Sequence, residues 1–196
     1  MPLEVRLEIV AEIATALAAA HSVGVIHRDV KPSNVLIEEQ KDGAVQIRLT
    51  DFGIGQLTDR GVLARAGITI TGVTESTGGA QLTSRSGTRL YMAPELVAGR
   101  LPSIQSDIYS LGVLFYQLIV GDLSEPLTTD WERRVDDPLL IEDLRSCLAG
   151  NPADRFASAD QLAQRLRTLP QRRAALAERE TAEQAAPCAA EKWACS

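Results

Sequence analysis

The sequence predicts a mostly helical α+β domain with a very small sheet. Apolar residues recur at helical spacing between positions 5 and 20, and again in three stretches after position 106. Two short strand-like runs between positions 35 and 49 surround a turn signal, which indicates a hairpin. Between the hairpin and the later helices, positions 55–89 are rich in Gly, Ser and Thr, which is typical of a long functional or disordered loop.

The first helix is expected over residues 5–20, with Gly24 as its stop just past the last turn. Val25 and Ile26 then indicate a short buried strand that leads into the next segment. The apolar face of the helix is expected to consist of Val10, Ile13, Ala14, Leu17 and Ala20.

The hairpin is expected from two runs, residues 35–37 and residues 45–49. The second run alternates apolar and polar side chains, as a half-buried strand does. Asp42 and Gly43 between the runs are a frequent pair in tight hairpin turns, because glycine readily adopts the positive φ that such turns require.

The most apolar helix is expected to begin at Ser106 or Asp107 and to run to Val120. Gly121 directly after it has the position of a helix-ending glycine. The apolar run is too short to span a bilayer, so it indicates a core helix and no membrane segment in this chain.

Two further helices are indicated by their first residues. Asp137 followed by Pro138 combines a capping side chain with proline at the first helical position. Ser158 and Gln161 have the spacing of a capping box. These helices are expected over residues 139–149 and 159–169.

Composition indicates one domain over residues 1–169, followed by an Ala/Glu/Arg-rich tail or linker over residues 170–196 that is polar enough to form a frayed helix. The net charge is −6 and aromatic residues make up 4% of the chain, so no nucleic-acid partner is expected. The three cysteines show no metal-ligand spacing and are odd in number, which favours the reducing cytoplasm.

Three motifs carry the chemistry, namely HRDVKPSN at residues 27–34, DFG at residues 51–53 and APE at residues 93–95. They follow one another with the hairpin between the first two and the long polar loop between the last two. Over residues 2–169 the chain resembles the large, C-terminal lobe of eukaryotic-like (Hanks-type) serine/threonine protein kinases, closest to the bacterial members. The resemblance implies a kinase-like large lobe with a small β-hairpin and a long activation loop.

The same resemblance implies the catalytic residues. Asp29 would orient or accept the proton of the substrate hydroxyl, and Lys31 would offset charge on the γ-phosphate of ATP. Asn34 and Asp51 would be the Mg²⁺ ligands, and Leu36 would form the floor under the adenine ring. Taken singly, Asp29 and Asn34 are also common turn residues, but their spacing within one eight-residue motif favours catalysis.

Four residues are implied as supports of this site. His27 is expected to be a packed, hydrogen-bonded histidine that braces the loop. Glu95 is expected to form a buried ion pair with Arg155. Asp107 would hold the backbone of the catalytic loop, and simple helix capping is the alternative for it, although the two roles are compatible.

Lys31 and Thr88 match the serine/threonine branch of the family, so protein Ser/Thr hydroxyls are the expected acceptors. Arg28 would pair with a phosphate on the activation loop, on a site among residues 83–86 such as Ser84 or Ser86. The alternative is a solvated insert whose Ser/Thr content reflects only flexibility.

No glycine-rich phosphate loop, strand lysine or partner glutamate precedes residue 5. The expected activity is Mg²⁺-dependent transfer of the γ-phosphate of ATP to proteins, with the small lobe missing from this sequence and supplied by the same or another chain. The alternative is a non-catalytic kinase-like interaction module. A small-molecule phosphotransferase is disfavoured by Thr88 and the APE motif at residues 93–95.

Overall fold

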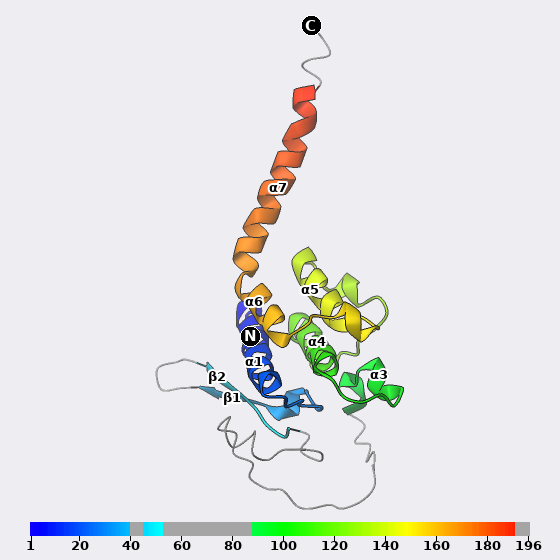
Figure 1. The fold of residues 1–196 in the computed structure, drawn as a ribbon. Helices are drawn as coiled ribbons and strands as arrows, with labels where there is room; N and C mark the ends of the chain where they lie inside the picture. Colours follow the sequence, from blue (N-terminus) through cyan, green and yellow to red (C-terminus); the bar gives the residue numbers. More distant parts are fainter. Residues whose placement is uncertain (40–44, 53–87, 191–196) are drawn as a thin grey trace, which may run out of the picture.

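The computed structural model describes residues 1–39, 45–52 and 88–190, and confirms the mostly helical α+β class with one two-stranded sheet (Figure 1). The body of the molecule lies around helices α1 and α4, and α7 extends away from it. The elements are α1 (Leu3–Ser22), η1 (Pro32–Asn34), β1 (Val35–Glu39), β2 (Val45–Leu49), η3 (Thr88–Tyr91), α3 (Pro94–Val97), α4 (Ile104–Val120), η4 (Trp131–Arg134), α5 (Pro138–Leu148), η5 (Pro152–Asp154), α6 (Ala159–Arg167) and α7 (Leu169–Ala190).

The core forms where α1 packs against α4 and α6. The predicted face of α1 is confirmed, because its five apolar residues are all buried. Helix α4 is buried on most of its circumference, and Phe115 and Tyr116 are among its largest fully buried side chains. Burying an apolar side chain of this size contributes about 1.5–3 kcal/mol to the stability of the fold, so the buried side chains of α4 stabilise the core strongly.

The start of α4 differs from the prediction. The helix begins at Ile104 and its N-cap is Ser103, so Ser106 and Asp107 both lie inside it. Ser103 Oγ accepts from the Ser106 N–H at 3.2 Å, and Ser106 Oγ accepts from the Ser103 N–H at 3.0 Å, which satisfies both amides reciprocally. The predicted end is confirmed, because Gly121 has a φ of 85° and closes the helix.

Two other local predictions need correction. Val25 and Ile26 form no strand in the structure, because the Val25 N–H donates to the Ala20 carbonyl and so ends α1. At α6 the Ser158 side chain makes no capping hydrogen bond, although the helix starts where expected. There the Ala157 N–H donates to Gln161 Oε1 at 2.9 Å.

The remaining boundaries agree with the predicted ones to within two residues. Asp137 caps α5, since its Oδ1 accepts from the Leu139 N–H at 2.8 Å. The hairpin is antiparallel and pairs Val35 with Leu49. The predicted turn at Asp42 and Gly43 lies outside the described residues.

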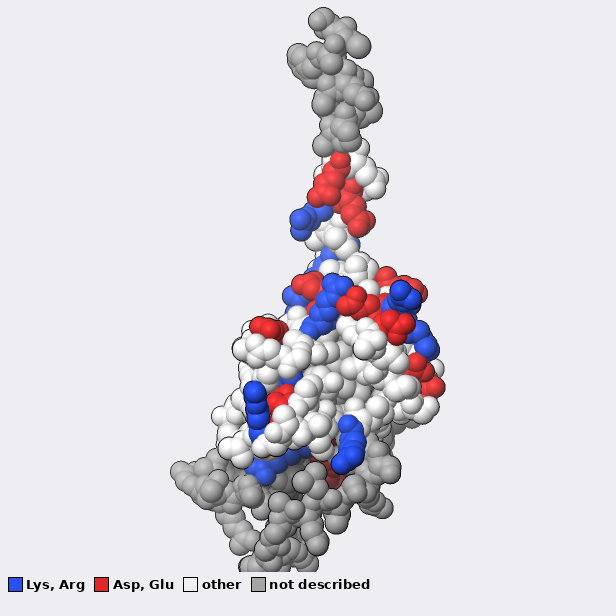
Figure 2. Space-filling view, turned by 90° about the vertical axis from the view of Figure 1, so that its right-hand side faces the viewer, with Lys and Arg blue, Asp and Glu red and all other residues white. Residues whose placement is uncertain are grey.

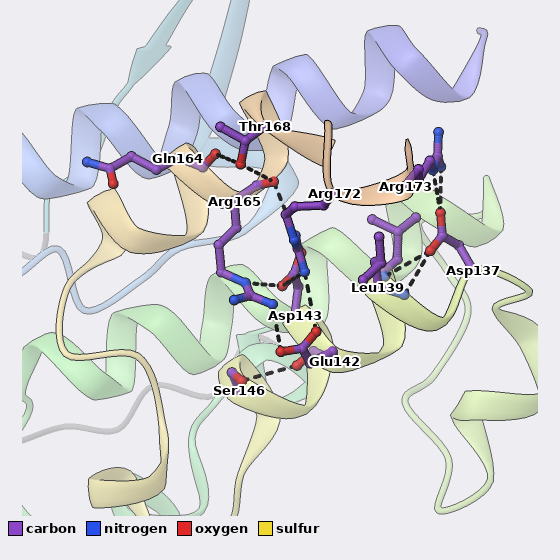
Figure 3. A network of polar contacts seen from close by, with 11 residues as sticks. Asp137, Leu139, Glu142, Asp143, Ser146, Gln164, Arg165, Thr168, Arg172 and Arg173 are labelled. Carbon is purple, nitrogen blue, oxygen red and sulfur yellow. Dashed lines mark hydrogen bonds and ion pairs between the residues drawn. The ribbon is translucent and has the colours of Figure 1, made fainter. Parts of the chain in front are cut away.

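The C-terminal segment that the composition assigns to a tail forms a 22-residue helix, α7. Its first residue, Leu169, is 2% exposed and packs on the core. Arg172 and Arg173 in its first turns bond to Asp143 of α5 and to Asp137, the N-cap of α5 (Figure 3). The start of α7 is therefore bound to the body by an apolar contact and by ion pairs.

Charged side chains of both signs gather where α7 leaves the body (Figure 2). The face below them in this view carries few charges. None of the helices within the described ranges combines the length and the apolar character needed to cross a membrane.

Candidate active site

The catalytic motif and the DFG motif meet at the open end of the hairpin. Asn34 ends η1 directly before β1, and Thr50 directly follows β2. The Thr50 N–H donates to the Asn34 carbonyl at 2.9 Å, which continues the strand pairing by one residue on each side. The register of the sheet therefore places Asp51 next to Asn34, the last residue of the catalytic motif.

Asp29 lies at the centre of a small polar cluster. Lys31 Nζ donates to Asp29 Oδ2 at 2.5 Å, and Asn34 Nδ2 donates to the same oxygen at 3.1 Å. Asn34 Nδ2 also donates to the Asp29 backbone carbonyl at 2.8 Å. The Asp29 side chain is 29% exposed, so the carboxylate is oriented by its neighbours and still reachable from outside.

The backbone of this site is strained at two positions. Arg28 has a φ of 71° and Asp51 a φ of 54°, in the left-handed region that non-glycine residues rarely adopt. Such conformations cost on the order of 1–3 kcal/mol each and persist only where the surrounding structure holds them. The strained residues are the neighbour of Asp29 and the acid of the DFG motif, so the strain coincides with the expected chemistry.

Asp107 of α4 holds the strained loop. Its Oδ1 accepts from the Arg28 N–H at 2.8 Å and its Oδ2 accepts from the His27 N–H at 2.7 Å. Asp107 is 1% exposed and lies inside α4, so the capping alternative for it is wrong. Its contacts are those expected of a residue that supports the loop.

His27 is fully buried beside the loop that it begins. Its Nδ1 accepts from the Asp29 N–H at 3.3 Å, and its ring centroid lies 4.5 Å from that of Phe52 in the DFG motif. Burial lowers the pKa of His27, against the opposing effects of Asp107, the Thr50 carbonyl and Asp29. The imidazole therefore packs between the two motifs, and its burial disfavours the charged form.

Glu95 and Arg155 form the expected buried ion pair. Arg155 Nη1 and Nη2 donate to the two carboxylate oxygens of Glu95 at 2.7 and 2.8 Å, and the side chains are 0% and 5% exposed. Burial alone would raise the pKa of Glu95, but the hydrogen bonds from Arg155 hold it below its ordinary value. Arg155 also lies 4.9 Å from the Tyr109 ring centroid and donates to two backbone carbonyls, so it joins α3 to α4 and to the chain after α5.

A small pocket lies beside Asp29, and two of its contacts were not anticipated from the sequence. Tyr91 Oη donates to Gln117 Oε1 at 2.7 Å, and Ser110 Oγ donates to the Tyr91 carbonyl at 2.7 Å. Gln117 is fully buried, and a lone amide in the apolar run of α4 was the signal that could have revealed it. The pocket is lined by Arg28, Asp29, Val30, Tyr91, Met92, Leu96 and Ser110.

The other expected residues lie around this centre or outside the described ranges. Leu36 is on β1 and is 46% exposed, and Arg28 Nε is buried without a hydrogen-bond partner in the described part of the chain. Thr88 begins η3. Ser84 and Ser86 lie outside the described residues.

Asn34 and Asp51 fit a site for Mg²⁺, which prefers oxygen ligands and keeps waters or phosphates in its shell. The Asn34 Nδ2 contacts orient the amide, and among the residues that the structure describes Oδ1 receives one long contact of 3.4 Å, from Ser33 Oγ. Asp51 is exposed. No three His, Cys, Asp or Glu side chains cluster as a metal site among residues 1–39, 45–52 and 88–190.

Comparison with known proteins assigns residues 2–166 to the family model described as protein kinase domain. Serine/threonine-protein kinase PkaA of Streptomyces coelicolor is 37% identical over 172 residues, which cover 81% of this chain and 28% of that protein. PknL of Mycobacterium tuberculosis is 34% identical over 177 residues, which cover 81% of this chain and 39% of that protein. The chain thus spans well under half the length of these relatives.

Solved structures give the same result. The kinase domain of Mycobacterium tuberculosis PknI superposes with a TM-score of 0.57 at 30% identity. The match covers 85% of this chain and 56% of the solved one.

Proposed function

The chain belongs to the protein kinase family, among the bacterial serine/threonine kinases, and on that premise we propose that it is the catalytic large lobe of an enzyme that transfers the γ-phosphate of ATP to protein Ser/Thr hydroxyls. The observation that carries the proposal is the convergence of Lys31 and Asn34 on one carboxylate oxygen of Asp29. The sheet register adds Asp51 at the same end of the hairpin.

The reaction needs positioning and charge neutralisation more than covalent work by the protein. Asp29 would accept a hydrogen bond from the attacking hydroxyl and take its proton as the phosphoryl group transfers. Lys31, on the Asp29 carboxylate in this structure, would offset charge that develops on the transferred phosphoryl oxygens. Asn34 and Asp51 would hold Mg²⁺, which neutralises part of the nucleotide phosphate charge when bound.

We further propose that a small lobe, from the same longer protein or from another chain, covers the outer face of the hairpin. Leu36 on β1 is 46% exposed and lies on the strand face opposite Val35, which packs against the core. Protein substrates and a cytoplasmic location complete the proposal.

The test is phosphate transfer from Mg·ATP labelled in its γ-phosphate, measured on a generic Ser/Thr protein substrate with the chain supplied with its small lobe. Asp29→Asn should lower the rate by about 10²–10⁴-fold, since it removes the proposed base while preserving shape. Asp154→Asn is the matched control, because Asp154 is exposed on η5 and should leave the rate unchanged.

Equal rates for Asp29→Asn and the unchanged protein would overturn the proposal. So would the absence of transfer by every form, which would favour the non-catalytic interaction module. The structure supports catalysis over that alternative, because an interaction module has no physical need for the Asp29, Lys31, Asn34 and Asp51 arrangement.

A further inference from the structure

The C-terminal end of α4 is closed by a side chain from another helix. Arg6 lies in the first turns of α1, and its Nη1 donates to the Leu118 carbonyl at 2.8 Å and to the Ile119 carbonyl at 3.1 Å. Arg6 is half-buried, and the partners are 112 and 113 positions away in the sequence. None of the motifs that indicate the catalytic chemistry includes Arg6, so the contact is a product of helix packing.

These two carbonyls are among those that a helix cannot satisfy by itself. The last four carbonyls of an α-helix have no intrahelical donor. In α4 the Gln117 carbonyl accepts from the backbone N–H groups of Gly121 and Asp122, at 2.8 and 3.2 Å. Arg6 supplies the donor for the next two carbonyls. The last turn of α4 contains no basic residue of its own, so the cation that complements the negative end of the helix dipole comes from α1.

Gly121 leaves the space that the guanidinium of Arg6 occupies. A Cβ atom at Gly121 would lie 2.8 Å from Arg6 Nη1, which is too close for two non-bonded atoms of this kind. Gly121 also has a φ of 85°, which glycine adopts without a steric penalty. The residue after α4 is therefore glycine for two reasons, the left-handed backbone and the room that it gives to Arg6.

Arg6 and the catalytic loop lie at opposite ends of the same pair of helices. Helices α1 and α4 run antiparallel, because Arg6 meets the end of α4, whereas His21 in the last turn of α1 lies 2.8 Å from Asp107 in the first turns of α4. Asp107 also holds the His27 and Arg28 amides of the catalytic loop. The two ends lie about 16 Å apart along α4, at 1.5 Å of rise per residue.

The two kinds of contact between α1 and α4 differ in how closely they fix the position of α1. Apolar packing is non-directional, so it holds the helices together without fixing how far one extends along the other. A hydrogen bond requires a donor–acceptor distance of about 2.7–3.2 Å. Arg6 therefore fixes the axial position of α1 on α4, and sliding of α1 would move the catalytic loop relative to Asp107.

We propose that Arg6 is a positioning residue of the catalytic loop, which acts from the far end of α1 by fixing the axial position of α1 on α4. Gly121 is the residue of α4 that accommodates it. The importance of this loop for phosphate transfer rests on the proposed function. The coupling of Arg6 to the loop does not, because it can be measured without catalysis.

The test measures amide hydrogen exchange in the full chain and in three variants. Arg6→Ala removes the donor, whereas Arg6→Lys keeps a charged donor that can reach the same carbonyls. Arg167→Ala is the matched control, because it removes another arginine that bonds to α1. Arg167 Nη2 donates to Glu12 Oε1 at 2.7 Å, but both side chains are 40% exposed and the contact joins α1 to α6.

Arg6→Ala should speed exchange of the His27 and Arg28 amides about tenfold, under conditions in which they exchange by local opening. Arg6→Lys should restore most of the protection, and Arg167→Ala should leave both loop amides unchanged. A residue that only stabilises the fold would instead speed core amides such as Val10, which exchange through global unfolding. Unchanged exchange at the two loop amides in Arg6→Ala, or no restoration by lysine, would overturn the proposal.

A second pair of variants tests the role of Gly121. Gly121→Ala and Gly99→Ala both place a side chain on a left-handed backbone, with φ of 85° and 78°, but a Cβ at Gly99 meets no atom of the described residues within 4 Å. Gly121→Ala should therefore raise the equilibrium constant for unfolding about tenfold more than Gly99→Ala does. In the Arg6→Ala background this excess should disappear, because no guanidinium is displaced. An excess that persists without Arg6 would contradict the proposed fit between the two residues.

The outcomes separate this proposal from the proposed function. If exchange at the loop amides follows Arg6 while Asp29→Asn leaves phosphate transfer unchanged, the proposed function fails and the role of Arg6 stands. If Asp29→Asn abolishes transfer while the loop amides do not respond to Arg6→Ala, the proposed function stands and the role of Arg6 fails.

Discussion

Two buried aspartates, Asp107 and Asp143, are 1% and 0% exposed, yet they bind different kinds of partner. Asp107 accepts from two backbone amides and one histidine at the catalytic loop. Asp143 accepts from the guanidinium groups of Arg165 and Arg172, where α5, α6 and α7 meet (Figure 3). Backbone partners hold a loop in one conformation, whereas long cationic side chains hold helices together.

The difference also determines how much stability is lost when each aspartate is replaced. The amides that Asp107 accepts from belong to the main chain, so they cannot turn to water without moving the loop. The hydrogen bond from His27 is buried and the one from Arg28 is partly buried. The side chains of Arg165 and Arg172 are 31% and 18% exposed, so they can turn to solvent when their partner is removed. Equal burial of the two carboxylates therefore does not imply an equal loss of stability when they are replaced.

The largest effect is expected from Asp107→Ala. Three donors lose their acceptor in a buried place, so the free energy of unfolding should fall by about 3–5 kcal/mol. Urea unfolding followed by circular dichroism measures this. Asp107→Asn should cost less, because its amide oxygen can still accept one backbone N–H, and an alanine variant as stable as the asparagine variant would contradict the hydrogen-bond account.

Asp143→Ala should cost less, about 2 kcal/mol, since its two arginines can be rehydrated at the surface. The loss should be measured by the same unfolding experiment and should leave exchange at the His27 and Arg28 amides unchanged. A cost equal to that of Asp107→Ala would break the distinction between the two sites.

The two sites should also differ in how they affect the pH dependence of stability, because the loop contains His27 whereas Asp143 is surrounded by arginines. Burial holds the pKa of His27 below its ordinary value of 6.5, although Asp107, the Thr50 carbonyl and Asp29 oppose the shift. Below about pH 6.5 the unfolded chain then binds more protons than the folded chain, so stability falls as the pH falls.

The titration of this one group can change the free energy of unfolding by at most about 1.4 kcal/mol per pH unit. His27→Phe, which keeps a ring against Phe52, should make the free energy of unfolding depend less on pH between pH 7 and pH 5.5. Asp143→Ala should lower the free energy of unfolding by the same amount across this range. Unfolding in urea across this range measures both. An unchanged slope in His27→Phe would mean that another group causes the pH dependence.

The smallest effect is expected from Arg173→Ala. Arg173 bonds to Asp137 at 2.7 Å, but its side chain is 43% exposed, and exposed ion pairs contribute about 0–1 kcal/mol. Its neighbour Arg172, on the buried Asp143, is the matched comparison and should cost more when changed to alanine. Thermal unfolding of the two variants measures the difference, and a larger loss for Arg173 would reverse the ranking by burial.

Much of the fold was accessible from local sequence patterns. The buried face of α1, the hairpin, the Asp137 cap and the stop at Gly121 all follow from periodicity or turn chemistry within a few residues. The errors were also local. Ser103 rather than Ser106 caps α4, because a serine three residues from another serine can satisfy the amide in either direction.

In the candidate site, too, some features were predictable from the sequence and others were not. The types and spacing of Asp29, Lys31 and Asn34 were visible in the sequence, and the pairing of Glu95 with Arg155 followed from the family resemblance. The sequence did not indicate that Tyr91 bonds to Gln117. A buried amide in a helix signals that a partner exists, but it does not identify that partner.

The sequence by itself determined the class of the fold, the order of the motifs and the chemistry of the residues that carry them, because each depends on neighbours along the chain. Only the tertiary structure decided that His21 shares the Asp107 carboxylate with the catalytic loop, and that Arg172 of α7 reaches Asp143 of α5. These contacts depend on how helices distant in sequence pack together. Packing brings the side chains within bonding distance, and burial then makes each unsatisfied polar group costly enough for the contact to persist.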